Sequence, residues 1–197
     1  MGYEAVMDTS KALDPADAYY FKSIIVVMRW MVEIDRIDIA TEAYPLSSHL
    51  AYPREVNLEA AFHVMAYLKH KHNSRIVFDL TYPKIDEIIL KYCDWKDFYG
   101  DVEEVIPPNA PKPRGKDVDL RAKVDSEHAW DKETRQLRTG YLIFCNISLV
   151  DWMYKRQPTI ETSVFDAEFV AFKHVMEAFH IIRYKLRMMG VPLSGCS

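Results

Sequence analysis

The hydrophobic positions in the first third of the chain follow a helical period. Asp14 followed by Pro15 is a typical helix start, because the aspartate accepts hydrogen bonds from free N–H groups and proline has no N–H to lose at the first helical position. Nearly every position from Tyr19 to Val32 is apolar, so we expect the first helix to be largely buried. A second helix is predicted from Asp38 to about Leu50, kinked or interrupted at Pro45.

A third helix and a short strand complete this first zone. The apolar residues of the helix recur at steps of three and four: Leu58, Ala61, Phe62, Met65 and Leu68. The segment from Ser74 to Leu80 then reads as a short strand. The next zone, residues 81–118, is acidic and rich in proline. Its part from Ile106 to Lys116 predicts an extended, partly polyproline-like linker between two structural halves.

Residues 119–197 combine strand and helix patterns. Three strands are predicted: Asp119–Ser126, Leu137–Cys145 and Leu149–Lys155, the last two forming a hairpin. A long helix follows from about Val164 to Met189, with Gly190 as its natural C-terminal cap. One apolar stripe of this helix is expected to face the core: Phe165, Phe169, Phe172, Met176, Phe179, Ile182, Leu186 and Met189. The predicted fold class is therefore α+β or α/β.

Composition and charge narrow the class of protein. The 197 residues are 49% hydrophobic, which is ample for a buried core, and the net charge of -4 excludes a global basic field for nucleic acid. The three cysteines are too few and too scattered for a disulfide framework or a tetrahedral zinc site. No signal peptide or transmembrane segment is evident in the sequence. We therefore expect a soluble protein of the cytoplasm or nucleus.

Two carboxylates are the candidates for chemistry. Asp125 ends the first strand of the third zone, where the backbone fixes the direction of a metal-binding side chain. Glu168 lies in the first turns of the long helix. Both have a simpler interpretation. Asp125, Glu127 and Asp131 can merely solvate a loop, and the helix dipole alone favours acidic residues such as Asp166 and Glu168 near a helix start.

Four short motifs follow one another in this zone: Asp125-Ser126-Glu127-His128-Ala129, Thr139-Gly140-Tyr141, Trp152-Met153-Tyr154-Lys155-Arg156-Gln157 and Asp166-Ala167-Glu168-Phe169-Val170-Ala171. In this order they resemble the ribonuclease H region of copia-type LTR retrotransposon Pol polyproteins. Two motifs of the first zone resemble the segment after the reverse transcriptase palm of the same family: Arg36-Ile37-Asp38-Ile39-Ala40 and Tyr67-Leu68-Lys69. The resemblance spans about residues 14–193. It divides the chain into connection-like helices (1–80), an acidic Pro-rich linker or insertion (81–118) and a truncated ribonuclease-H-like domain (119–197).

The resemblance implies a function and a site. Asp125 and Glu168 would be catalytic carboxylates that hold Mg²⁺ or Mn²⁺, and Glu127 would have a loop role. Arg138 and Lys155 would contact phosphates or serve a structural role. The implied partners are an RNA–DNA hybrid and the remainder of the Pol polyprotein, with no membrane.

The departures from the family limit that activity. The family fold has a further strand after the long helix, with a third metal-binding aspartate, and we expect this chain to stop before it. No Tyr-x-Asp-Asp palm motif occurs either. We therefore expect a fragment whose ancestral role was reverse transcription and hybrid cleavage, inactive alone and weak in binding metal and hybrid. The alternative is a non-catalytic, host-retained interaction module on the same scaffold.

Overall fold

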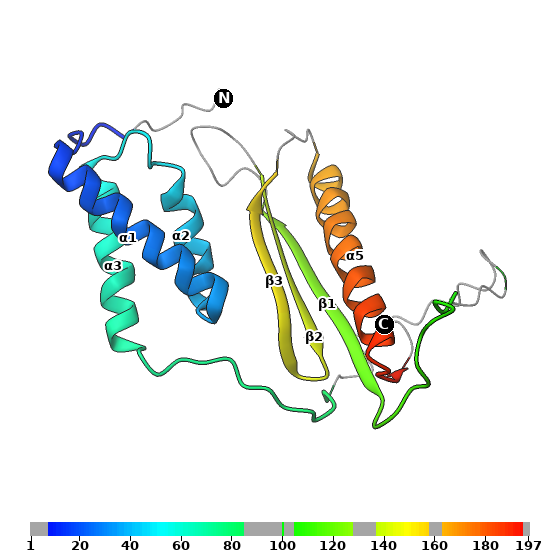
Figure 1. Cartoon of the computed structure of the whole chain (residues 1–197). Coiled ribbons are helices and arrows are strands. Elements are labelled where there is room, and N and C mark those ends of the chain that lie inside the picture. The colour runs from blue at the N-terminus through cyan, green and yellow to red at the C-terminus, as the bar shows by residue number, and fades with distance from the viewer. Residues whose placement is uncertain (1–7, 85–99, 101–104, 128–136, 158–162, 195–197) are drawn as a thin grey trace. The chain divides into compact units, whose positions relative to one another are not determined.

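The computed structural model describes residues 8–84, 100, 105–127, 137–157 and 163–194 (Figure 1). Contacts between residues divide the chain into two compact units. The first unit comprises residues 1–77, 124–141 and 152–171, and the second comprises residues 78–123, 142–151 and 172–197. The described residues form helices and a sheet with three antiparallel strands, so the α+β class is confirmed.

Helix α1 (Pro15–Ile34) begins where the sequence predicts. The Asp14 carboxylate caps it by accepting hydrogen bonds from the N–H groups of Ala16 and Asp17, both at 2.9 Å. Its buried residues lie at steps of three and four along one face: Phe21, Ile24, Ile25, Met28 and Val32. The prediction of a largely buried helix is wrong, because a second apolar face is open to solvent and leaves Trp30 64% exposed.

The predicted second helix is two shorter elements, a 3-10 turn η1 (Ile37–Ile39) and helix α2 (Ala40–Ser47), and Pro45 lies inside α2. Helix α3 (Glu55–His70) confirms the third predicted helix. Helices α1, α2 and α3 pack together around one hydrophobic core (Figure 1). The buried face of α3 is formed by Ala61, Val64 and Leu68, so two residues of the predicted stripe, Phe62 and Met65, are instead exposed.

The strand predicted from Ser74 to Leu80 is absent, because this extended segment joins no ladder. Its backbone is bound by side chains instead. The Ser148 hydroxyl donates to the Asp79 carbonyl at 2.7 Å and accepts from the Asp79 N–H at 2.6 Å. The Asn146 side chain donates to the Leu80 carbonyl at 2.9 Å. The end of the predicted strand, Asp79 and Leu80, is therefore bound by polar side chains of a hairpin rather than by another strand.

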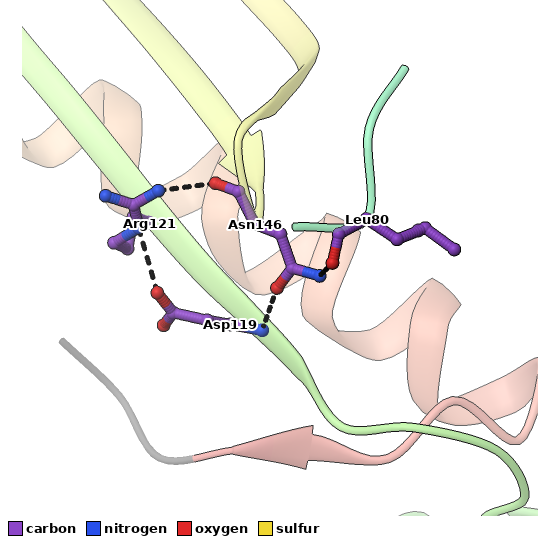
Figure 2. Close-up of polar contacts among 4 residues, drawn as sticks. All are labelled: Leu80, Asp119, Arg121 and Asn146. Atoms are coloured by element: carbon purple, nitrogen blue, oxygen red, sulfur yellow. Dashed lines mark hydrogen bonds and ion pairs between the residues drawn. The ribbon is translucent and has the colours of Figure 1, made fainter. Parts of the chain in front are cut away.

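Asn146 organises that turn (Figure 2). It has φ 56°, a left-handed conformation that asparagine tolerates better than most residues. Its backbone N–H donates to the Asp119 carbonyl at 2.7 Å, and its side-chain oxygen accepts from the Asp119 N–H at 2.9 Å. Arg121 donates to the Asn146 carbonyl and forms an ion pair with Asp119. One buried amide therefore holds the hairpin turn, the start of β1 and the segment at Leu80 together.

The sheet has the strand order β3-β2-β1-β4. Its strands are β1 (Val118–Glu127), β2 (Arg138–Cys145), β3 (Ser148–Arg156) and β4 (Leu193–Ser194). The short β4 runs parallel to β1, with Val118 opposite Leu193. The expectation that the chain stops before a strand after the long helix therefore needs correction, because such a strand begins at Leu193.

Helix α5 (Val164–Met188) ends two residues before the predicted capping glycine, Gly190. Gly190 has φ 72°, and the Val191 N–H reaches back to the Leu186 carbonyl at 3.0 Å, as in a Schellman cap. The buried apolar residues of the helix lie at steps of four, Ala167, Ala171, Val175 and Phe179, and the buried Arg183 continues the series. The first part of the predicted stripe is wrong, since Phe165 is 76% exposed and Phe169 and Phe172 are also open to solvent. The small side chains of Ala167 and Ala171 let the backbone of α5 lie close to its neighbours, which the larger phenylalanine side chains would prevent.

Candidate functional site

Asp125 lies near the carboxyl end of β1 and is exposed. Its neighbour Ser126 is buried, with 8% exposure. Because successive side chains of a strand point to opposite faces, Asp125 and Ser126 project from opposite sides of β1. The carboxylate is thus open to solvent on a fixed strand. The side chain of Glu127, and Asp131 altogether, lie outside the described residues.

Glu168 is half-buried in the second turn of α5. The start of the helix is held by Ser163, whose hydroxyl donates to the Asp166 carboxylate at 2.6 Å and accepts from the Asp166 N–H at 3.1 Å. Asp166 therefore has a structural role at the helix start, through a hydrogen-bonded cap in addition to the helix dipole that the simpler interpretation invoked. Glu168 takes no part in this cap. The buried Ala167 before it marks the face that packs inward.

Gln157, directly after β3, connects these elements, although the sequence assigned it no role beyond its place in a motif. It is 2% exposed, and its Nε2 donates to Thr139 Oγ1 at 2.7 Å and to the Ala167 carbonyl at 3.1 Å. Its backbone N–H donates to the Leu137 carbonyl at 2.8 Å. Gln157 Oε1 is buried and has no hydrogen-bond partner within the part of the chain that the structure describes. The alternation of the preceding strand gave no signal for this burial, because its aromatic positions, Trp152 and Tyr154, have the other parity.

The two basic residues of the motifs differ in exposure. Arg138 is only 5% exposed, and its guanidinium lies 5.7 Å from the centre of the Tyr154 ring and 3.4 Å from the Ser48 hydroxyl. This environment favours the structural role for Arg138, since a buried guanidinium does not meet a phosphate. Lys155 is exposed on β3 and is open to either role.

The donor chemistry of the site fits a hard divalent ion, because Asp125 and Glu168 offer carboxylate oxygens, which Mg²⁺ and Mn²⁺ prefer. No cluster of three or more His, Cys, Asp or Glu side chains suited to a metal occurs among the described residues. The convergence of Asp125 and Glu168 on one ion stays a prediction. Cys145 offers no alternative chemistry, because burial raises the pKa of its thiol and so keeps it protonated.

Comparison with known proteins gave no match to a family model, to a curated protein or to a solved structure. Within the described residues, none of the helices combines the length and the apolar character needed to cross a bilayer.

Proposed function

We propose that this chain is part of a ribonuclease-H-like nuclease module of a copia-type retrotransposon Pol polyprotein. The complete module would cleave the RNA strand of an RNA–DNA hybrid. This chain supplies the scaffold and two of the carboxylates, Asp125 and Glu168, and is inactive by itself.

The strand order is the observation that carries the proposal. Three antiparallel strands, a long helix, and then a strand parallel to β1 at its free side give the order β3-β2-β1-β4, which is the arrangement expected of a ribonuclease-H-like sheet. β4 is the element that the sequence did not predict within this chain. Its pairing with β1 is therefore support that the four motifs alone did not provide.

The register of β4 indicates what is missing. Leu193 lies opposite Val118 in a parallel pair, so strand residues advance together along β1 and β4. Asp125 is seven residues beyond Val118, and the seventh residue after Leu193 lies past Ser197. A carboxylate from β4 at the level of Asp125 is thus beyond the present sequence. We infer that the site as it stands has two carboxylates from described elements, one on β1 and one on α5.

Each carboxylate would have a limited role. In the complete module, divalent ions would activate a water and stabilise the leaving oxygen of the phosphodiester. Asp125 would bind from a rigid strand and Glu168 from the second turn of α5. Two carboxylates carry two negative charges, whereas two divalent metal ions carry four positive charges, so the fragment should bind metal weakly. With a net charge of -4 it also offers no broad basic surface for the hybrid.

The test is incubation of the purified chain with a labelled RNA–DNA hybrid in Mg²⁺ or Mn²⁺. The expected result is no cleavage above buffer. The comparison uses a second, longer chain in which β4 is extended in the same register, so that an added aspartate lies level with Asp125. This extended chain is expected to cleave the hybrid. Replacing that aspartate by asparagine is the matched control. Failure of the extended chain to cleave would count against the nuclease proposal. Cleavage by the original chain, abolished by Asp125→Asn, would show that two carboxylates suffice.

One observation favours the alternative, a non-catalytic interaction module. Three aromatic side chains of α5, Phe165, Phe169 and Phe172, are more than half exposed, and the first two rings stack with centroids 6.4 Å apart. An exposed aromatic group of this kind is typical of a contact surface. Under this alternative the extended chain would stay inactive.

A further inference from the structure

We propose that this chain forms a symmetric dimer in which the solvent-exposed face of α1 pairs antiparallel with the same face of a second copy. The inference is independent of the proposed function. It rests on residues of the first compact unit alone, where α1 is apolar on the side that faces the core and also on the side that faces solvent.

The exposed apolar residues of α1 form a second stripe along the helix. They recur with helical spacing, and only Ser23 interrupts them: Tyr19, Tyr20, Val26, Val27, Trp30 and Ile34. At 3.6 residues per turn they cover about 120° of the helix surface, as wide as the stripe by which a helix normally faces a core. The charged residues of this stretch lie along one edge of the stripe: Lys22, Arg29 and Glu33. The outer face of α1 therefore has the pattern of a buried face.

The area of this surface is close to what a stable dimer needs. Phe62 of α3 extends the stripe, because its ring centre lies 6.1 Å from that of Tyr20 and its side chain is exposed. With about 200 Å² for a whole aromatic side chain, the exposed parts of the four aromatic residues give about 500 Å². The exposed valines and isoleucine raise this to about 700 Å², which exceeds the apolar patch of a typical monomer and approaches the roughly 800 Å² that each partner contributes to a standard interface.

The order of side-chain sizes along the stripe is self-complementary in an antiparallel pair. Two copies of α1 can cross so that Val26 of one lies opposite Val27 of the other, with the two-fold axis between them. Trp30 of each copy then lies opposite Ser23 of the other, so a large side chain meets a small one twice per dimer. In a parallel pair the two Trp30 side chains would meet each other instead.

The charged edge of the stripe also fits this arrangement. In an antiparallel pair the same edges of the two helices face each other. Lys22 of one copy comes within two residues, about 3 Å along the axis, of the level of Glu33 of the other. Arg29 lies farther round the helix, with its guanidinium 5.9 Å from the centre of the Tyr44 ring. The stripe and its charged edge therefore both favour a second copy of this chain as the occupant.

The test is sedimentation equilibrium of the full chain across micromolar concentrations, with circular dichroism as the check of folding. Wild type is expected to shift from monomer to dimer as its concentration rises. Val27→Glu should weaken dimerisation by about a hundredfold or more, because it buries two carboxylates at the centre of the interface. The matched control is Phe165→Glu, which places the same charge at an exposed aromatic position of α5 and should leave the dimer unchanged.

An exchange of side-chain sizes tests the antiparallel register. Ser23→Trp places two large side chains opposite each other and Trp30→Ser leaves a gap, so each alone should weaken the dimer by about tenfold. The double variant exchanges the two sizes and should restore dimerisation to within a few fold of wild type. If it does not, the register is wrong. The interface itself is wrong if Val27→Glu dimerises like wild type or if Phe165→Glu abolishes the dimer. A wild-type chain that stays monomeric at every concentration would show that the stripe serves a different partner or none, which overturns the proposal.

Discussion

Removal of the Asn146 side chain offers the sharpest test of the fold, because one residue makes two separable contributions. The side chain is 2% exposed and forms hydrogen bonds to the Asp119 N–H and the Leu80 carbonyl, at 2.9 Å each. The backbone has φ 56°, which costs an alanine about 1 kcal/mol and a glycine almost nothing. Asn146→Gly therefore removes the hydrogen bonds alone, and Asn146→Ala removes them and adds backbone strain.

Figure 2 shows the contacts of Asn146 with Asp119 and Leu80, and the exposure of each partner sets the magnitude of its loss. The Asp119 N–H is half-buried and loses its acceptor, which should cost about 1.5 kcal/mol. Leu80 is 78% exposed, so water can replace the amide at its carbonyl, and we expect about 0.5 kcal/mol there. Asn146→Gly should thus lose about 2 kcal/mol and Asn146→Ala about 3 kcal/mol of unfolding free energy.

The assay is urea unfolding followed by far-UV circular dichroism, with amide hydrogen exchange at Asp119 as the local readout, because two compact units need not unfold in one step. Both variants should accelerate exchange at Asp119. A matched variant, Ser148→Ala, removes the neighbouring contacts to Asp79 and leaves the Asp119 amide protected. The reasoning is refuted if alanine is no worse than glycine, or if exchange at Asp119 is the same in wild type and Asn146→Gly.

Two further predictions concern pH. Burial and the hydrogen bond to Glu33 raise the pKa of Tyr44 to about 12, so the folded chain favours the neutral phenol. The contribution of this phenol to the unfolding free energy is full below about pH 10 and should be lost between about pH 10 and 12. Tyr44→Phe should remove this loss, which is worth about 1 kcal/mol after solvent screening, as comparison of urea midpoints at pH 9 and 11.5 would show. The hydrogen bond from Arg36 lowers the pKa of Asp38, so the pair stabilises the fold above about pH 4 and loses that contribution as pH falls through the depressed value. Arg36→Met should cost about 2 kcal/mol at pH 7, and a cost that stays the same as acid titrates Asp38 through its lowered pKa would contradict the assignment.

Local signals predicted the ends of elements well. Asp14 and Pro15 start α1 as expected, and Gly190 ends α5, because a cap depends on a few adjacent residues whose chemistry is visible in the sequence. The hairpin after β2 was predicted for the same reason. The segment from Ser74 to Leu80 has the composition of a strand, but a strand also requires a ladder partner, and that partner is set by the tertiary structure.

The inward faces of the helices were predicted less well. In α5 the apolar stripe through Phe165 and Phe169 and the stripe through Ala167 and Ala171 both have helical spacing, and the larger residues suggested the wrong one. Spacing shows that a face exists but does not tell which face meets the sheet. The inward face is decided by how closely the helix packs, and small residues occupy that face where the helix backbone lies close to strands. Trp30 in α1 is exposed for a related reason, because α1 carries apolar residues on more than the one face that the core covers.

The candidate site also combines residues that the sequence predicts with contacts that only the fold reveals. Asp125 and Glu168 were predicted as site residues from motifs, since carboxylates at a strand end and a helix start are visible as residue types in order, and their role stays a prediction. The structural role of Gln157 was not predicted, because it consists of two hydrogen bonds to residues 18 and 10 positions away that belong to other elements. A buried amide that joins two strands to a helix fixes the relative position of these elements, and contacts of this kind exist only once the chain is folded.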